Sequence, residues 1–157
     1  MTSAHRIIPP ALQGVYDNWH FAPAVVANGL IFCSGIIGTS PDGDPPAENG
    51  LAGAQTTTAD ASSELDALMA VRDPEAQFAT AFEALRAILQ AAGADLSDLV
   101  EITTYHVDIS RHMATFMQVK DRYILSPYPA WTAIGVSELI VPGGLMEIRA
   151  VAKAPQS

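Results

Sequence analysis

The clearest pattern of apolar and polar residues predicts an amphipathic helix from Asp73 to Gly93. Asp73 can accept a hydrogen bond from the first turn, and Pro74 suits the first helical position. Glu75 lies near the positive end of the helix dipole, and Gly93 suits the left-handed residue that ends a helix. One face of this helix carries apolar residues at spacings typical of a helix: Phe78, Phe82, Leu85, Leu89 and Ala92.

An apolar run from Leu30 to Ser34 predicts a short buried strand. Asn28-Gly29 is a turn pair, so the run forms a β-hairpin if Val25-Val26 begins a partner strand. Gly35 and Gly38 follow, and they indicate a bend or a close approach of the backbone at this point.

The second half of the chain predicts a strand from Leu99 to Val107, because apolar and polar residues alternate there. One face of this strand carries Val100, Ile102, Thr104 and His106. A second helix is expected after it, capped by Asp108 or Ser110 and running to about Leu125, where prolines follow. Two further strands are expected, from Trp131 to Val136 and from Leu145 to Ala152.

The order strands, helix, strand, helix, strands predicts an α+β sandwich, with a mixed sheet and two main helices on one face. We expect one domain over residues 1–157. The other face of such a sheet needs cover, and formation of a trimer is one way to supply it. Ser40 to Gly53 predicts a surface loop rich in Pro, Gly, Asp and Asn, and Ser62 to Met69 predicts a short helix; together they make an extended segment from about Pro41 to Arg72.

Composition narrows the partners that this chain can have. Hydrophobic residues make up 49% of the 157 residues, charged residues only 16%, and the net charge is −9. Binding to nucleic acid is not expected, because no run of Lys or Arg offers a basic footprint for phosphates.

The lone Cys33 lies in an apolar run and predicts a buried thiol, with no intrachain disulfide. The N-terminus lacks an apolar segment of signal-peptide length, and no apolar run reaches the length of a membrane span. We therefore expect a cytoplasmic protein that does not associate with membranes.

Three segments in order resemble the Rid/YjgF family of reactive-intermediate deaminases. The first runs from Phe21-Ala22-Pro23-Ala24-Val25 to Phe32-Cys33-Ser34-Gly35. The second runs from Gln77 through Gly93 to Leu99-Val100-Glu101-Ile102-Thr103-Thr104-Tyr105. The third joins Pro129-Ala130-Trp131-Thr132-Ala133-Ile134-Gly135-Val136 to Pro142-Gly143-Gly144-Leu145-Met146-Glu147-Ile148. Together they span most of the chain.

The resemblance implies a chorismate-mutase-like fold, a homotrimer, and a ligand cleft between subunits. It also implies hydrolysis of enamines or imines to a carbonyl compound and ammonia, without a cofactor. In deaminating members an arginine holds the substrate carboxylate and a glutamate positions or activates water. The glutamate corresponds to Glu147 here, and Ser34 keeps its place in the early motif. The segment from Pro41 to Arg72 is longer than in most of the family.

This chain departs from the family pattern at the arginine, whose position is taken by Trp131. Phe21 stands where a tyrosine is common, so a hydroxyl is also lost. A tryptophan offers stacking area and one N–H donor but no charge for a carboxylate. Either the substrate is more apolar or aromatic, or the chain does not deaminate. Arg149 shares a strand face with Glu147 and is a candidate source of the missing charge.

Each candidate residue also has a structural interpretation. Trp131 suits interface packing as well as ligand contact. Phe21 can belong to the core, and Ser34 can bond to the backbone. His106 suits a half-buried structural role, or acid–base work if its face lines the cleft. A metal site is not expected, because the four histidines lack ligand spacing.

The sequence thus leads to two hypotheses. The first is an enamine or imine deaminase with Glu147 as the catalytic residue and Trp131, Phe21, Ser34, Arg149 and His106 as ligand-binding candidates. The second is a trimer that binds a small ligand or a protein without catalysis. An older name of the family refers to ribonuclease activity, which the acidic net charge of this chain disfavours.

Overall fold

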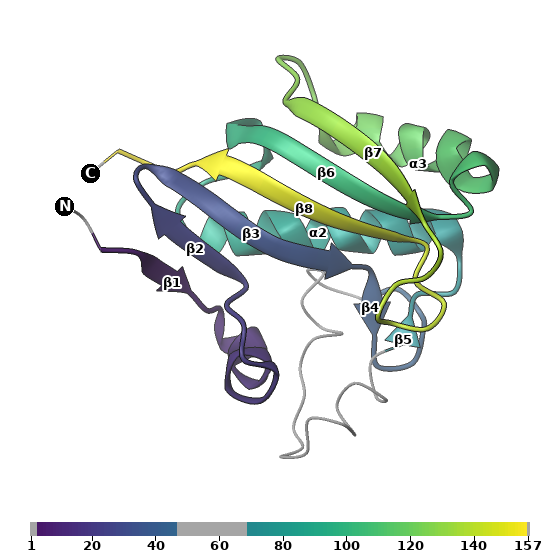
Figure 1. Ribbon diagram of the computed structural model, residues 1–157, viewed down its shortest axis with the longest axis horizontal. Coiled ribbons are helices and arrows are strands. Elements are labelled where there is room, and N and C mark those ends of the chain that lie inside the picture. The colour runs from purple at the N-terminus through teal and green to yellow at the C-terminus, as the bar shows by residue number, and fades with distance from the viewer. Residues whose placement is uncertain (1–2, 47–68, 157) are drawn as a thin grey trace.

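The computed structural model describes residues 3–46 and 69–156, and these form a six-stranded sheet in the order β1-β2-β3-β8-β6-β7 (Figure 1). Within this described part of the chain only β6 and β7 are parallel neighbours, so the sheet is mixed as predicted. The strands are β1 (His5–Ile7), β2 (Ala24–Ala27), β3 (Leu30–Ile37), β6 (Leu99–Val107), β7 (Ala130–Val136) and β8 (Met146–Lys153).

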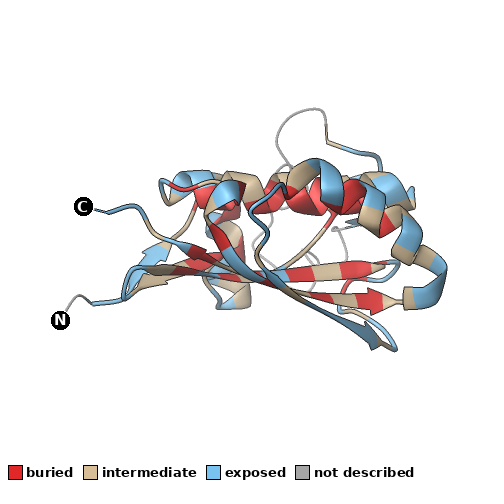
Figure 2. Ribbon diagram, turned by 90° about the horizontal axis from the view of Figure 1, so that it is seen from above, coloured by how far each residue is buried: buried red, intermediate tan, exposed pale blue. Residues whose placement is uncertain are grey.

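Two helices, α2 (Pro74–Ala91) and α3 (Ile109–Tyr123), cover the same face of this sheet (Figure 2). Their buried residues meet alternate residues of the central strands, which removes both apolar surfaces from water. The fully buried side chains at this contact include Phe78, Phe82, Phe116, Ile102 and Ile148. The predicted α+β class is therefore confirmed.

Helix α2 begins and ends where its local signals place it. The Asp73 carboxylate accepts a hydrogen bond from the Ala76 N–H at 2.9 Å, and Pro74 opens the first turn. Gly93 has a φ of +84°, a left-handed conformation that costs glycine little.

Helix α3 differs from its prediction at the start. Asp108 is the N-cap residue but has a left-handed φ of +52°, and its side chain makes no capping hydrogen bond. The tight turn from β6 into α3 imposes this conformation, so neither Asp108 nor Ser110 acts as the expected cap. The helix ends at Tyr123, two residues before the predicted Leu125.

The predicted hairpin is confirmed, with Asn28 and Gly29 both at positive φ between β2 and β3. Strand β3 runs three residues further than predicted, and its register against β8 shifts between Cys33 and Ile36. The bend expected from the two glycines lies here. A Cβ on Gly38 would overlap the carbonyl oxygen of Gln77.

The β6 strand has its predicted bounds, but its first residues are out of phase with the predicted faces. A register shift between Leu99 and Glu101 lets Leu99 point into the core, while Val100 stays 44% exposed. Ile102, Thr104 and His106 do share the buried face.

A small second sheet pairs β4 (Thr39–Ser40) with β5 (Met69–Ala70). The sequence predicts a loop at Ser40 and a helix reaching Met69. Both predictions are wrong, because Ser40 and Met69 pair as strand residues. Pairing across the chain outweighs the weak local helical signal there. The rest of the predicted loop and helix lies outside the described residues.

Across the described residues, no helix has both the length and the apolar character that crossing a membrane requires. Nor does any group of three or more His, Cys, Asp or Glu residues gather in this part of the chain in a way that could hold a metal ion.

Candidate functional site

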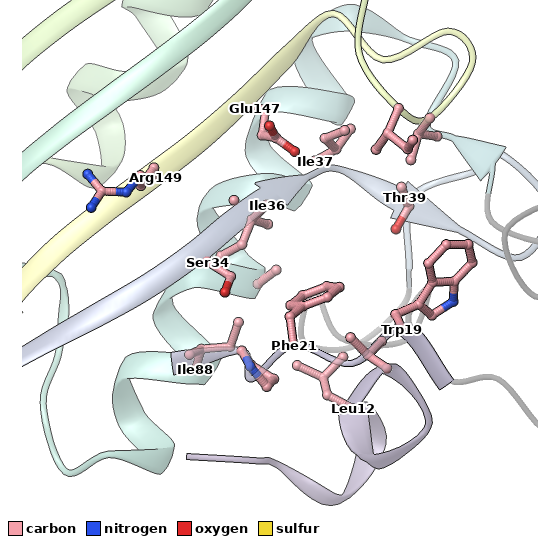
Figure 3. Close-up of a pocket in the computed structure, with 16 residues that line it drawn as sticks. Leu12, Trp19, Phe21, Ser34, Ile36, Ile37, Thr39, Ile88, Glu147 and Arg149 are labelled. Atoms are coloured by element: carbon pink, nitrogen blue, oxygen red, sulfur yellow. The ribbon is translucent and has the colours of Figure 1, made fainter. Parts of the chain in front are cut away.

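A cavity of about 530 Å³ opens where the end of β3 meets the N-terminal segment (Figure 3). Strand β2 pairs with β3 only as far as Cys33, opposite Ala24, whereas β3 continues to Ile37. The gap left along this edge is bordered by residues 12–23, by α2 and by β8. A volume of this size suits a small organic ligand. Its lining residues include Leu12, Val15, Trp19, Phe21, Ser34, Gly35, Ile88, Glu147 and Arg149.

Glu147 reaches this cavity because of its position in β8. Its neighbours Met146 and Ile148 are fully buried beneath the helices, so alternation turns Glu147 toward the opposite face of the sheet. Gly35 leaves room for the carboxyl group, since a Cβ there would lie 2.8 Å from the Glu147 Cδ. A side chain at this position would therefore displace the carboxyl group from its place in the cavity.

Burial raises the pKa of the Glu147 carboxyl above its ordinary value of 4.5. No hydrogen bond or ion pair joins this carboxylate to another side chain in the described part of the chain, although it is half-buried. A half-buried carboxylate without a partner is costly, and such groups concentrate at functional sites.

Ser34 and Phe21 lie on the N-terminal side of the same cavity (Figure 3). The Ser34 hydroxyl donates to the carbonyl oxygen of Ala22 at 2.6 Å, and its backbone N–H donates to Pro23 at 2.9 Å. These two hydrogen bonds hold Ala22 and Pro23, which follow the N-terminal segment, against the edge of β3. The hydroxyl oxygen of Ser34 keeps the capacity to accept a hydrogen bond from a ligand.

Arg149 also lines the cavity, on the same strand face as Glu147 as the sequence predicts. The pairing of β8 with β6 shows this, because Glu147 lies opposite Tyr105 and Arg149 opposite Thr103. The guanidinium is 4.0 Å from the Glu101 carboxylate, and both side chains are about half exposed. An exposed pair at this distance is weak, so Arg149 remains free to turn toward an anion.

Trp131 and His106 lie on the other face of the sheet, beneath α3. The Trp131 Nε1–H donates to the Thr104 hydroxyl oxygen at 2.9 Å, and the His106 Nε2 lies 2.7 Å from the same oxygen. The Lys120 ammonium lies 4.7 Å from the Trp131 ring centroid. Phe116 packs against the rings of His106 and Trp131. Within one chain, therefore, neither Trp131 nor His106 contacts the cavity that holds Glu147.

The structure adds lining residues that the sequence patterns did not single out. Leu12, Val15 and Trp19 come from a short N-terminal segment, and Ile88 from α2. The segment contains a π-helical turn, η2 (Val15–Trp19), which lacks the repeat that predicts a longer helix. The two aromatic residues Trp19 and Phe21, two positions apart, are the one signal that could have pointed to it.

The fold and the cavity define a small α+β sandwich protein with a ligand-sized cleft that carries a carboxylate. A family model described as Endoribonuclease L-PSP matches residues 15–154. The chain belongs to this family, which is the Rid/YjgF family.

Individual relatives agree with this assignment. The RutC family protein YjgH of Escherichia coli K12 is 27% identical over 157 residues, covering 99% of both chains. A solved structure of YjgH superposes with a TM-score of 0.73, covering 99% of this chain and 100% of that one. Rv2704 of Mycobacterium tuberculosis has 22% identity and a TM-score of 0.69, over 97% and 100% of the chains. RidA of a Psychrobacter species has 23% identity and a TM-score of 0.64, over 98% and 99%. The last two likenesses establish the fold alone.

Proposed function

We propose that this chain hydrolyses an enamine or imine to a carbonyl compound and ammonia, with Glu147 as its catalytic residue. The observation that carries the proposal is the Glu147 carboxylate, which lies half-buried at the wall of a ligand-sized cavity. Its pKa is raised by burial, and it has no partner among residues 3–46 and 69–156. These are the properties of a carboxylate that accepts a proton from water in a partly desolvated site.

The proposed reaction needs a single proton acceptor that later returns the proton. The ionised Glu147 takes a proton from water as the oxygen adds to the C=N carbon of the N-protonated imine, which gives a neutral carbinolamine. The protonated carboxyl then gives this proton to the amine nitrogen. As the C–N bond breaks and ammonia leaves, the hydroxyl group passes its proton to the Glu147 carboxylate and the C=O bond forms. A raised pKa favours this exchange, because the protonated form is then accessible nearer to neutral pH.

Arg149 and Ser34 supply the binding contacts in this proposal. The guanidinium of Arg149 can form paired hydrogen bonds with a substrate carboxylate. Its position on β8 supports this role, since Arg149 and Glu147 border the same cavity. The Ser34 hydroxyl oxygen would accept a hydrogen bond from the substrate N–H.

The test is ammonia release from freshly generated imines that carry aliphatic or aromatic side groups. We expect release faster than the spontaneous hydrolysis measured without protein, because the cleft orients water and substrate together. Equal rates with and without the protein across the whole set would contradict the deaminase proposal.

A second candidate is a trimer that binds a small ligand or a protein without turning it over. The placement of Trp131 favours it, because the residue at the family's arginine position is bonded to Thr104 beneath α3. Binding of imine-like compounds without ammonia release would select this candidate. RNA is a poor ligand for either version, given the net charge of −9.

We also propose that the chain forms a homotrimer. The sheet face opposite the helices exposes apolar side chains, with Phe32 40% and Ile134 41% exposed. A surface of this kind gains free energy when it is covered by another subunit. Light scattering should give a molecular mass three times that of one chain, and a mass equal to one chain would rule the trimer out.

A further inference from the structure

The cavity beside β3 has two chemically different ends. Glu147 and Arg149 provide the charged end. Aliphatic and aromatic side chains provide the other end, where the N-terminal segment approaches α2: Leu12, Val15, Trp19, Phe21 and Ile88. In Figure 3, Leu12, Phe21 and Trp19 lie on one side of β3 and the two charged residues of β8 on the other. A ligand that fills the cavity therefore needs a polar head and an apolar body.

The floor of the apolar end is built into the core. Leu12, Val15 and Ile88 are each buried and belong to the hydrophobic cluster beneath the sheet. Because core packing fixes these side chains, the apolar end does not depend on a ligand for its shape. A preformed apolar surface of this kind binds an apolar group without a large ordering cost.

Trp19 contributes an aromatic ring to this apolar end. It is the last residue of η2 and is only partly buried against the core. His20 follows with a left-handed φ of +61°, and its N–H bonds to the Tyr16 carbonyl at 3.2 Å. This sharp end to the turn brings Trp19 and Phe21 to the same cavity. Two aromatic rings offer a large apolar area on few rotatable bonds.

We propose that Trp19 and the apolar segment around it select substrates with a large branched or aromatic side group. The polar head of such a substrate, a 2-imino acid, would lie at Arg149 and Glu147. This assignment of the head rests on the proposed function, whereas the size preference rests on the cavity alone. Trp19 acts here as a specificity-determining residue.

The experiment measures binding of stable 2-oxo acids, which are products of the proposed reaction, by titration calorimetry. The series is pyruvate, 4-methyl-2-oxopentanoate and phenylpyruvate, which share the head and differ in the size of the apolar group. Phenylpyruvate should bind roughly a hundredfold more tightly than pyruvate, because each further buried methylene contributes a factor of several. Equal affinities across the series would overturn the proposal without any variant.

Two variants separate the two ends of the cavity. Trp19→Ala should remove about tenfold of the preference for phenylpyruvate and leave the affinity for pyruvate unchanged. Arg149→Gln should weaken all three acids by a similar factor, because it removes a contact to the shared carboxylate. Trp19→Phe keeps an aromatic ring and should keep most of the preference.

Tyr128→Ala is the matched control, since this exposed aromatic does not line the cavity and its loss should change nothing. A loss of affinity that is equal for all three acids in Trp19→Ala would overturn the role of Trp19. Size-dependent binding without ammonia release would refute the deaminase proposal and leave this inference standing. Turnover of imines without a size preference would support the deaminase proposal and refute the role of the apolar end.

Discussion

Glu147→Gln is expected to lower the rate of ammonia release from an accepted imine by about a hundredfold or more. The amide keeps the size and shape of the side chain but cannot accept a proton from water. The variant should still bind 2-oxo acids, because the apolar end of the cavity is unchanged. A rate equal to that of the unsubstituted protein would remove Glu147 from the mechanism.

The pH dependence of turnover gives an independent check on the same residue. Turnover should rise with pH as the Glu147 carboxyl ionises, and its midpoint should lie above the ordinary pKa of 4.5. Glu75→Gln is a matched control, because Glu75 is an exposed carboxylate paired with Arg122 on the helices. Its turnover should match that of the unsubstituted protein.

Thermal unfolding distinguishes a loss of activity in Glu147→Gln from a loss of folding. Because burial raises the pKa of this carboxyl, its ionised form costs folding free energy once the pH exceeds that raised pKa. Glu147→Gln should therefore melt at the same or a higher temperature at pH 7. The difference should vanish below the ordinary pKa of 4.5, where the carboxyl is protonated in both folded and unfolded chains.

Acid is expected to destabilise the folded chain through His106. Burial lowers the pKa of this imidazole from 6.5 to about 4, so the folded chain holds it neutral. The associated stability is complete above pH 6.5 and is lost as the pH falls toward 4, by about 3 kcal/mol. Chemical denaturation across this pH range measures the loss directly.

The environment of His106 explains why the proton is excluded. The residue is 1% exposed, its Nε2 is bonded to the Thr104 hydroxyl, and Phe116 packs against its ring. Its Nδ1 is buried, and no hydrogen-bond partner for it lies within the described residues. His106→Leu should flatten the pH profile, whereas His112→Gln should leave it unchanged. A profile that stays steep in His106→Leu would assign the acid sensitivity to other groups.

Local signals predicted α2 and the hairpin well, because each relies on residues that act within a few positions of each other. Asp73, Pro74 and Gly93 need no distant partner to end a helix. The extension of β3 to Ile37 and the pairing of Ser40 with Met69 were missed, because both depend on segments far apart in the sequence. The left-handed Asp108 was missed for a similar reason, since the approach of α3 to β6 sets it.

For the candidate site, alternation in β8 correctly placed Glu147 and Arg149 on one face. Alternation does not reveal which face of a strand meets the helices, and this decides the surroundings of Trp131. Its indole packs on Phe116 and bonds to Thr104, which favours the buried side. The cavity contacts of Leu12 and Trp19 could not be predicted, because the cavity edge opens where β2 begins at Ala24, opposite Cys33, while β3 continues to Ile37.

Gln77 connects three separate parts of the chain through one buried side chain. Its amide donates to the carbonyl oxygens of Val71 and Gly143, and its oxygen accepts from the Leu145 N–H. The segment before α2 and the loop between β7 and β8 therefore cannot detach from α2 one at a time without leaving a buried amide group unpaired. These segments form one cooperative unit of local unfolding, and the cavity residues Ile140 and Val141 in that loop share its opening free energy.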